Sequence, residues 1–449
     1  MESRFSSKNK DYNTIFKPKR KGTDLEYQKS PNNPSISLFS CAMILLNANF
    51  GTDPYFVGGG FINGFYYNLF ALIICYIITI ISFLVVVKCW IHGCTFSFRT
   101  IWEYCISKNH FCWIPELSIV LSIFYLTMFY YSDSYITLAN IIVYFQDSDT
   151  LPDILQSRWI ITYAVTSVLC LPAIFIKEIH QFLIISIISN IALVIPFFIM
   201  IYHFVHLYER FPDFSIESNI VYKASNPVDT LNFVLYIAAI VGNHPVIEYV
   251  VQVMNNPTYN RVKGTFFVSN IIGFLINLIV GLVSVFMFMP SSYYDNIYLM
   301  FDEDSYYRYD TLIITGKIFL YIRSVCTLVV MVWIGSRHLA QMFDSQWEYS
   351  NWPTYRWIPQ TLATLCFILL NASGDYMNGT IITFSETIGM IGFMMNQFIL
   401  PGLFYMRMNR KEMIFRDPWW YLSVFLLFFG VIITIASFFS QLLTKVGDG

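Results

Sequence analysis

Two hydrophobic segments of this chain are each interrupted by glycine, proline and polar residues. The first interruption lies at residues 46–54, inside the apolar stretch 37–65, and the second lies at residues 241–245, inside the stretch 228–252. A helix that breaks within a bilayer exposes backbone N–H and C=O groups that lipid cannot satisfy. Such a break survives only where it lines a cavity or is buried in protein. Paired breaks at matching positions of two halves of a chain therefore indicate a ligand site.

The composition indicates a helical protein that crosses a membrane many times. Hydrophobic residues make up 56% of the 449 residues and charged residues only 12%, and the mean hydropathy is +0.54. Soluble domains carry about twice this charged fraction, and the apolar runs are long enough for a bilayer core of roughly 30 Å. The net charge of −2 does not favour a nucleic-acid partner. The sequence lacks the long alternating strands of outer-membrane barrels.

The apolar runs predict an all-α fold of eleven transmembrane helices. Residues 1–34 are polar and predict a disordered tail, and residues 35–449 form the transmembrane domain. Five spans form a first repeat at about 37–207, five form a second repeat at about 228–406, and helix eleven lies at about 418–443. The interrupted segments are then spans one and six, which predicts an inverted repeat. The expected spans are 37–63, 67–88, 114–144, 158–177, 180–207, 228–252, 264–289, 313–341, 355–371, 379–406 and 418–443.

The distribution of Lys and Arg predicts the orientation. Most of them lie in the tail and in every second loop, which places the N-terminus in the cytosol, and an odd number of spans places the C-terminus outside or in a lumen. The plasma membrane and a lysosomal or vacuolar membrane both remain open. No GxxxxGK[ST] phosphate-binding loop occurs, and we expect neither an enzyme nor an organic cofactor.

The first break combines backbone ends with neutral polar side chains. Gly51 and Pro54 weaken the helix, the first by its backbone entropy and the second by its missing N–H group. The half-helix before the break ends in free carbonyls, which suit a cation or an ammonium group, and the half-helix after it begins with free N–H groups, which suit a carboxylate. A zwitterion fits both ends. Asn47, Asn49 and Thr52 add oxygen ligands at the same depth.

The second break repeats this arrangement. Gly242 and Pro245 flank Asn243 and His244. A single proline in a membrane helix is often a simple kink, but two paired breaks, each with asparagine alongside, favour a binding site.

Charged residues within predicted spans are the other candidates for function. Asp53 lies in the first break, and Asp133 lies in the middle of span three without an obvious partner. Arg323 in span eight and Glu386 in span ten are expected to form structural ion pairs inside the bundle.

Four motifs in chain order carry a resemblance to a known family. They are residues 47–52 in span one, Leu171-Pro172 to Ser189 in spans four and five, residues 242–245 followed by Asn256-Pro257 and Arg261, and residues 386–405 in span ten, which end in Leu-Pro-x-x-Phe-Tyr. Together they resemble the amino acid/auxin permease family of the amino acid–polyamine–organocation superfamily. The similarity is greatest to its sodium-coupled neutral amino acid transporter branch.

The resemblance implies eleven spans, a five-plus-five inverted repeat and amino acid transport driven by Na⁺ or H⁺. In the sodium-coupled branch, the asparagine corresponding to Asn47 contributes to Na⁺ binding with a hydroxyl on span eight, for which Thr327 is the nearest match. The chain departs from the family at Asp53, where the family usually has glycine. An ionised Asp53 would repel a substrate carboxylate; alternatively it could be protonated, pair with a cation, or carry a coupled proton.

These observations predict a secondary transporter that moves amino acids by alternating access, with spans one and six rocking against spans three, four, eight and nine. The alternative is a transport-inactive amino acid sensor that signals through cytosolic partners. Coupling is expected through Na⁺ at Asn47 and Thr327, the one metal expected here, or through H⁺ at Asp53 or His244. The predicted substrate-binding residues are Asn49, Phe50, Gly51, Thr52, Val241, Gly242, Asn243 and His244.

Overall fold

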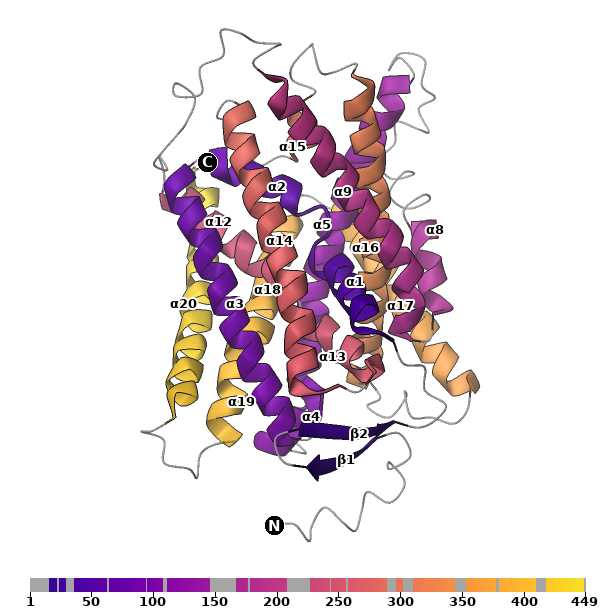
Figure 1. Cartoon of the computed structure of the whole chain (residues 1–449), viewed down its shortest axis with the longest axis vertical. Helices are drawn as coiled ribbons and strands as arrows, with labels where there is room; N and C mark the ends of the chain where they lie inside the picture. The colour runs from indigo at the N-terminus through magenta and orange to yellow at the C-terminus, as the bar shows by residue number, and fades with distance from the viewer. Residues whose placement is uncertain are drawn as a thin grey trace.

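The computed structural model shows a bundle of long helices with one small hairpin at its end (Figure 1). The structure describes residues 16–21, 24–29, 36–62, 64–93, 95–107, 111–145, 167–176, 178–207, 227–242, 244–255, 257–288, 296–301, 310–343, 353–376, 379–408 and 417–447.

Most of these residues are helical, in agreement with the predicted class. The helices of the first half are α1 (Leu38–Asn49), α2 (Pro54–Ile62), α3 (Phe65–Gly93), α4 (Phe98–Cys105), α5 (Ile114–Phe145), α8 (Ser167–Cys170) and α9 (Leu183–Val205), with 3-10 turns at Leu171–Ile174 and Ile179–Phe182. Those of the second half are α12 (Pro227–Val241), α13 (His244–Val253), α14 (Tyr259–Met287), α15 (Ile297–Met300), α16 (Thr311–Phe343), α17 (Pro353–Tyr376), α18 (Gly379–Met394), a π-helical turn (Met395–Ile399), α19 (Leu400–Met408) and α20 (Pro418–Gly447).

Many helices of the bundle have the length and composition of membrane-spanning segments. Within the described part of the chain, eight helices are long and apolar enough to cross a membrane. Others of the expected spans are divided at breaks, as at α1 and α2, or contain a shorter apolar stretch, as at Ile358–Leu370 within α17. Half of the expected fourth span lies outside the described residues, so eleven spans and the inverted repeat stay predictions.

The tail differs from the sequence-based prediction. Residues Phe16–Lys21 (β1) and Asp24–Lys29 (β2) form an antiparallel hairpin, whereas we expected the whole of 1–34 to be disordered. In β2 the apolar residues Leu25 and Tyr27 alternate with polar ones, which is the period of a strand, whereas β1 is a basic run without alternation. In Figure 1 the hairpin lies at one end of the bundle, and α20 ends at the other.

The two broken helices lie inside the bundle and are joined to each other. Ile36, just before α1, pairs with the end of α13: its N–H donates to the carbonyl of Val253 at 3.1 Å, and its carbonyl accepts from Asn255 at 3.1 Å. Around them α16 packs against α5 and α9, and α14 packs against α1 and α2. The breaks are therefore enclosed by long, unbroken helices.

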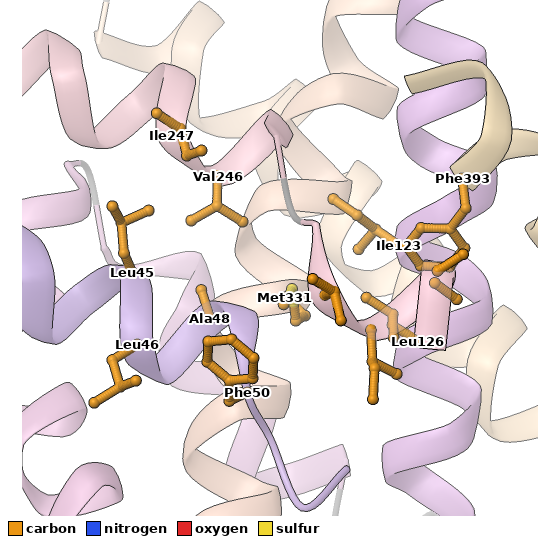
Figure 2. Packing of buried hydrophobic residues seen from close by; sticks show 14 of the residues in the cluster. Leu45, Leu46, Ala48, Phe50, Ile123, Leu126, Val246, Ile247, Met331 and Phe393 are labelled. Carbon is orange, nitrogen blue, oxygen red and sulfur yellow. The ribbon is translucent and has the colours of Figure 1, made fainter. Parts of the chain in front are cut away.

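Apolar side chains from several helices surround the end of α1 (Figure 2). Leu45, Leu46, Ala48 and Phe50 on the last turns of α1 and its cap belong to one buried cluster, together with Val246 and Ile247 of α13 and Met331 of α16. Phe50 is fully buried, and its ring lies against Gly273 of α14 so closely that a Cβ there would come within 2.0 Å of Phe50 Cζ. The first break is thus set in a closely packed, buried environment.

Candidate functional site

The first break is where the sequence predicts it. α1 ends at Asn49, Phe50 is extended with φ −132° and ψ 91°, and α2 begins at Pro54. Gly51 faces the ring of Tyr130 on α5, and a Cβ at this position would lie 2.3 Å from Tyr130 Cε1. Glycine at position 51 therefore has two effects. It weakens the helix, and it lets the backbone approach the aromatic ring of Tyr130 closely.

Asp53 turns its side chain back onto the break. Its Oδ2 accepts hydrogen bonds from the Gly51 N–H at 3.0 Å and from the Tyr130 hydroxyl at 2.8 Å, and its carbonyl accepts from the Tyr236 hydroxyl at 3.0 Å. The side chain is buried, with 1% exposure. The Gly51 N–H in the break therefore already has a carboxylate of the protein itself as its acceptor.

Asp133, for which the sequence offered no partner, is joined to the same break. Thr52 Oγ1 donates to Asp133 Oδ2 at 2.7 Å, and Asn296 Nδ2 donates to Asp133 Oδ1 at 3.4 Å. Thr52 and Asp133 are both buried. This contact connects the broken helix to α5, and it could be recognised only once the two segments were placed together.

Arg323 of α16 occupies the carbonyl end of α1. Its guanidinium donates to Leu46 O at 3.1 Å, Gly51 O at 3.2 Å and Asn47 Oδ1 at 3.3 Å, and further to Ser189 Oγ at 2.8 Å and Asn190 Oδ1 at 2.9 Å on α9. The side chain is completely buried. We expected a structural ion pair for Arg323, but among the described residues no carboxylate lies within ion-pair distance of it. Neutral oxygens and a helix end stabilise its charge instead.

At the second break, an uncharged side-chain amide donates hydrogen bonds to the carbonyls at the end of the helix. α12 ends at Val241 and α13 begins at His244. Gln397, on the π-helical turn between α18 and α19, donates through Nε2 to the carbonyls of Gly242 and, at 3.4 Å, Ala239. The π-helical turn places Gln397 at this helix end, and such turns frequently occur at functional sites.

The His244 ring has a hydrogen-bond partner at one of its two nitrogen atoms. Its Nε2 lies 3.2 Å from Ser82 Oγ of α3, and the Ser82 hydroxyl also donates to the carbonyl of Gln397. Asn243, which was predicted to bind substrate, lies outside the described residues.

Several buried polar atoms near the breaks have no hydrogen-bond partner among the described residues. At the first break they are both polar atoms of the Asn49 side chain and Asp53 Oδ1; at the second they are His244 Nδ1, Gln397 Oε1 and Thr79 Oγ1. An unpaired polar atom that is buried costs free energy, so a group of them marks a place where another molecule can supply partners.

The structure thus brings most of the predicted residues into two enclosed sites. Asn47 and Thr327 meet, with Thr327 Oγ1 donating to Asn47 Oδ1 at 3.1 Å. Gly51, Thr52 and Asp53 line the first break, and Val241, Gly242 and His244 line the second. Sequence reasoning missed Arg323, Tyr130 and Gln397 as members of these sites. For Arg323, the signal available in the sequence was a charged residue within an apolar span.

Comparisons with known proteins identify the fold. No protein-family model matches the sequence, and no curated protein matches it. Among solved structures 124 chains match. One is MhsT, crystallised in complex with L-phenylalanine; it has a TM-score of 0.59 and 12% identity, and the alignment covers 91% of this chain and 100% of that one. At this identity the likeness shows the fold, and the chain is a multi-pass helical membrane protein with that fold.

Proposed function

We propose that the protein is a secondary transporter that carries amino acids across a membrane by alternating access. One observation carries the proposal: two helices break inside the bundle, and unpartnered polar atoms lie buried beside both breaks. The fold is shared with a protein that was crystallised with an amino acid bound, and this supports an amino acid as the substrate class. The backbone at Asn49 to Thr52 and Val241 to His244 forms the proposed binding site.

The donors and acceptors at the two breaks suggest how a zwitterion is oriented. Asp53 Oδ1 and Asn49 Oδ1 lack partners among the described residues and are acceptors, so they suit an ammonium group. The Gly51 N–H is taken by Asp53 itself. The substrate carboxylate is therefore expected at the second break, where α13 begins at His244 and its first N–H groups and helix dipole favour an anion.

Alternating access requires contacts between the broken helices and their surroundings to open. The Thr52–Asp133 and Asp53–Tyr130 hydrogen bonds join the first break to α5. Both are short and buried, and they form part of the surface that has to separate if the broken helices rock against α5 and α16. We expect these contacts to differ between the states of the transport cycle.

Uptake into proteoliposomes tests the proposal. The purified full-length chain is reconstituted and offered a pool of labelled amino acids, with Na⁺ and proton gradients imposed separately. We expect saturable uptake above that of protein-free vesicles, reduced in Asn49→Leu and retained in Gly264→Ala, whose new Cβ meets nothing within 4 Å. Specific binding without uptake under either gradient would contradict transport and favour an amino acid sensor.

A further inference from the structure

The oxygens expected to bind a coupling Na⁺ are engaged by the protein. A hard cation takes several oxygen ligands, and carbonyl and amide oxygens are suitable ones. The oxygens at the carbonyl end of α1 are Leu46 O, Gly51 O and Asn47 Oδ1, and each accepts a hydrogen bond from the Arg323 guanidinium. A metal ion at these oxygens would have to share them with a fixed positive charge, and like charges at this distance repel strongly.

The side-chain oxygen of Asn47 is already surrounded by donors of the protein. Its Oδ1 accepts from Ser189 Oγ at 2.6 Å and lies 3.3 Å from Arg323 Nη1. Thr327 Oγ1 lies 3.1 Å from the same oxygen and also 3.0 Å from the Arg323 carbonyl. The amide orientation agrees with this role, because Nδ2 donates to Ser186 Oγ at 3.2 Å. The residues present therefore do not fit Na⁺ at Asn47 and Thr327 while Arg323 is in place.

The guanidinium has the contacts of a bound cation. It joins the carbonyl end of α1 to Ser189 and Asn190 on α9, while its own backbone belongs to α16. Every one of these partners is a neutral oxygen, and the end of a helix adds a partial negative charge. Arginine suits this place because its planar head holds several donors in fixed directions and is always charged.

We propose that the side chain of Arg323 replaces a coupling metal ion, so that the folded core of this protein does not depend on Na⁺. If the proposed transport function is correct, on which this consequence rests, substrate binding and uptake are also independent of Na⁺. The first break is then joined to α9 and α16 by a charge that is tethered to the protein, instead of by an ion that arrives and leaves.

The first test needs no substrate and therefore does not depend on the transport function. The unfolding temperature of the purified wild-type chain is measured in detergent with NaCl or with choline chloride, each at about 150 mM, and binding of radioactive sodium is measured on the same sample. We expect equal unfolding temperatures and no saturable sodium binding. Saturable sodium binding by wild type, or stabilisation by Na⁺ over choline, would overturn the proposal.

Two substitutions give the second test. Arg323→Ala removes the charge and frees the oxygens of Leu46, Asn47 and Gly51, so we expect a lower unfolding temperature that Na⁺ partly restores. Arg323→Lys keeps a positive charge and should stay insensitive to Na⁺. If Arg323→Ala folds and Na⁺ has no effect on it, the guanidinium does not occupy a metal-ion site. If Arg323→Ala does not fold, the wild-type sodium measurements and Arg323→Lys decide.

Uptake measurements then separate the two proposals. Saturable amino acid uptake by wild type that changes by less than about twofold between sodium and choline supports both. Uptake that requires Na⁺ would confirm transport and overturn the role of Arg323. Absence of uptake together with Na⁺-independent stability would overturn transport and leave the role of Arg323 intact.

Discussion

The hydrogen bond between Tyr130 and Asp53 provides a sharp test of the electrostatics at the first break. Tyr130→Phe removes only the hydroxyl that donates to Asp53 Oδ2 at 2.8 Å, with both residues buried. Asp53 Oδ2 accepts two hydrogen bonds, and we expect this carboxyl group to be ionised. A bond to a charged acceptor contributes about 1.5–3 kcal/mol, compared with about 0.5–1.5 kcal/mol for a bond between neutral groups.

Tyr55→Phe is a matched control for this substitution. The hydroxyl of Tyr55 is equally buried and donates at 2.7 Å to the carbonyl of Leu193, a neutral acceptor. Since the same atom is removed in both variants, the difference between their effects reports on the charge of Asp53. We expect Tyr130→Phe to lower the free energy of unfolding by about 1–1.5 kcal/mol more than Tyr55→Phe does.

The assay is denaturant titration of the detergent-solubilised chain, followed by tryptophan fluorescence at about pH 8, where an exposed carboxyl group is fully ionised. A ligand that binds the folded state stabilises it by an amount that grows with the ligand concentration, so all titrations are made without substrate. Equal costs for the two variants would refute the reasoning, because they would show that Asp53 behaves as a neutral acceptor.

Three further predictions concern the breaks and their packing. Asp53→Gly removes the carboxylate and frees its two donors, so the ratio of amino acid uptake to uptake of the decarboxylated amine should rise about tenfold, or about 1.4 kcal/mol. An unchanged ratio in competition assays would show that Asp53 does not repel the substrate carboxylate. Gly273→Ala should cost about 1–3 kcal/mol of stability, since the new Cβ would lie 2.0 Å from Phe50 Cζ. Gly264→Ala on the same helix should instead stabilise the protein by about 0.4–1 kcal/mol. Thermal unfolding of the two glycine variants, measured in parallel, checks both expectations. Gln397→Leu should lower the free energy of unfolding by about 1–3 kcal/mol because it leaves carbonyls at the end of α12 without their donor; a titration indistinguishable from wild type would contradict this.

Much of the fold could be predicted from local pattern. Long apolar runs marked the helices, and the structure places helices at all the expected spans that it describes. Gly51 with Pro54, and Gly242 with Pro245, marked the two breaks because their effect on a helix is a property of the residues themselves. The hairpin at residues 16–29 was not foreseen, since a polar, basic composition gives no strong signal for pairing.

The partners at the breaks could not be predicted in the same way. Asp133 had no visible partner in the sequence, and its contact with Thr52 joins residues 81 positions apart. Gln397 reaches the carbonyl of Gly242 across 155 positions. Such pairs depend on how helices pack side by side, and neither hydropathy nor helix propensity carries that information.

Local sequence pattern is enough to establish that this chain is a multi-spanning helical protein with two helices broken inside the membrane region. Those properties follow from the apolar length of segments and from the backbone behaviour of glycine and proline, which act locally. The partners of each break within the protein depend instead on how the helices pack together. This packing placed Arg323, 272 residues away along the chain, on the carbonyl of Gly51, where a free ion had been expected. A buried charge takes whichever oxygens the fold brings within reach, and that choice is made by packing.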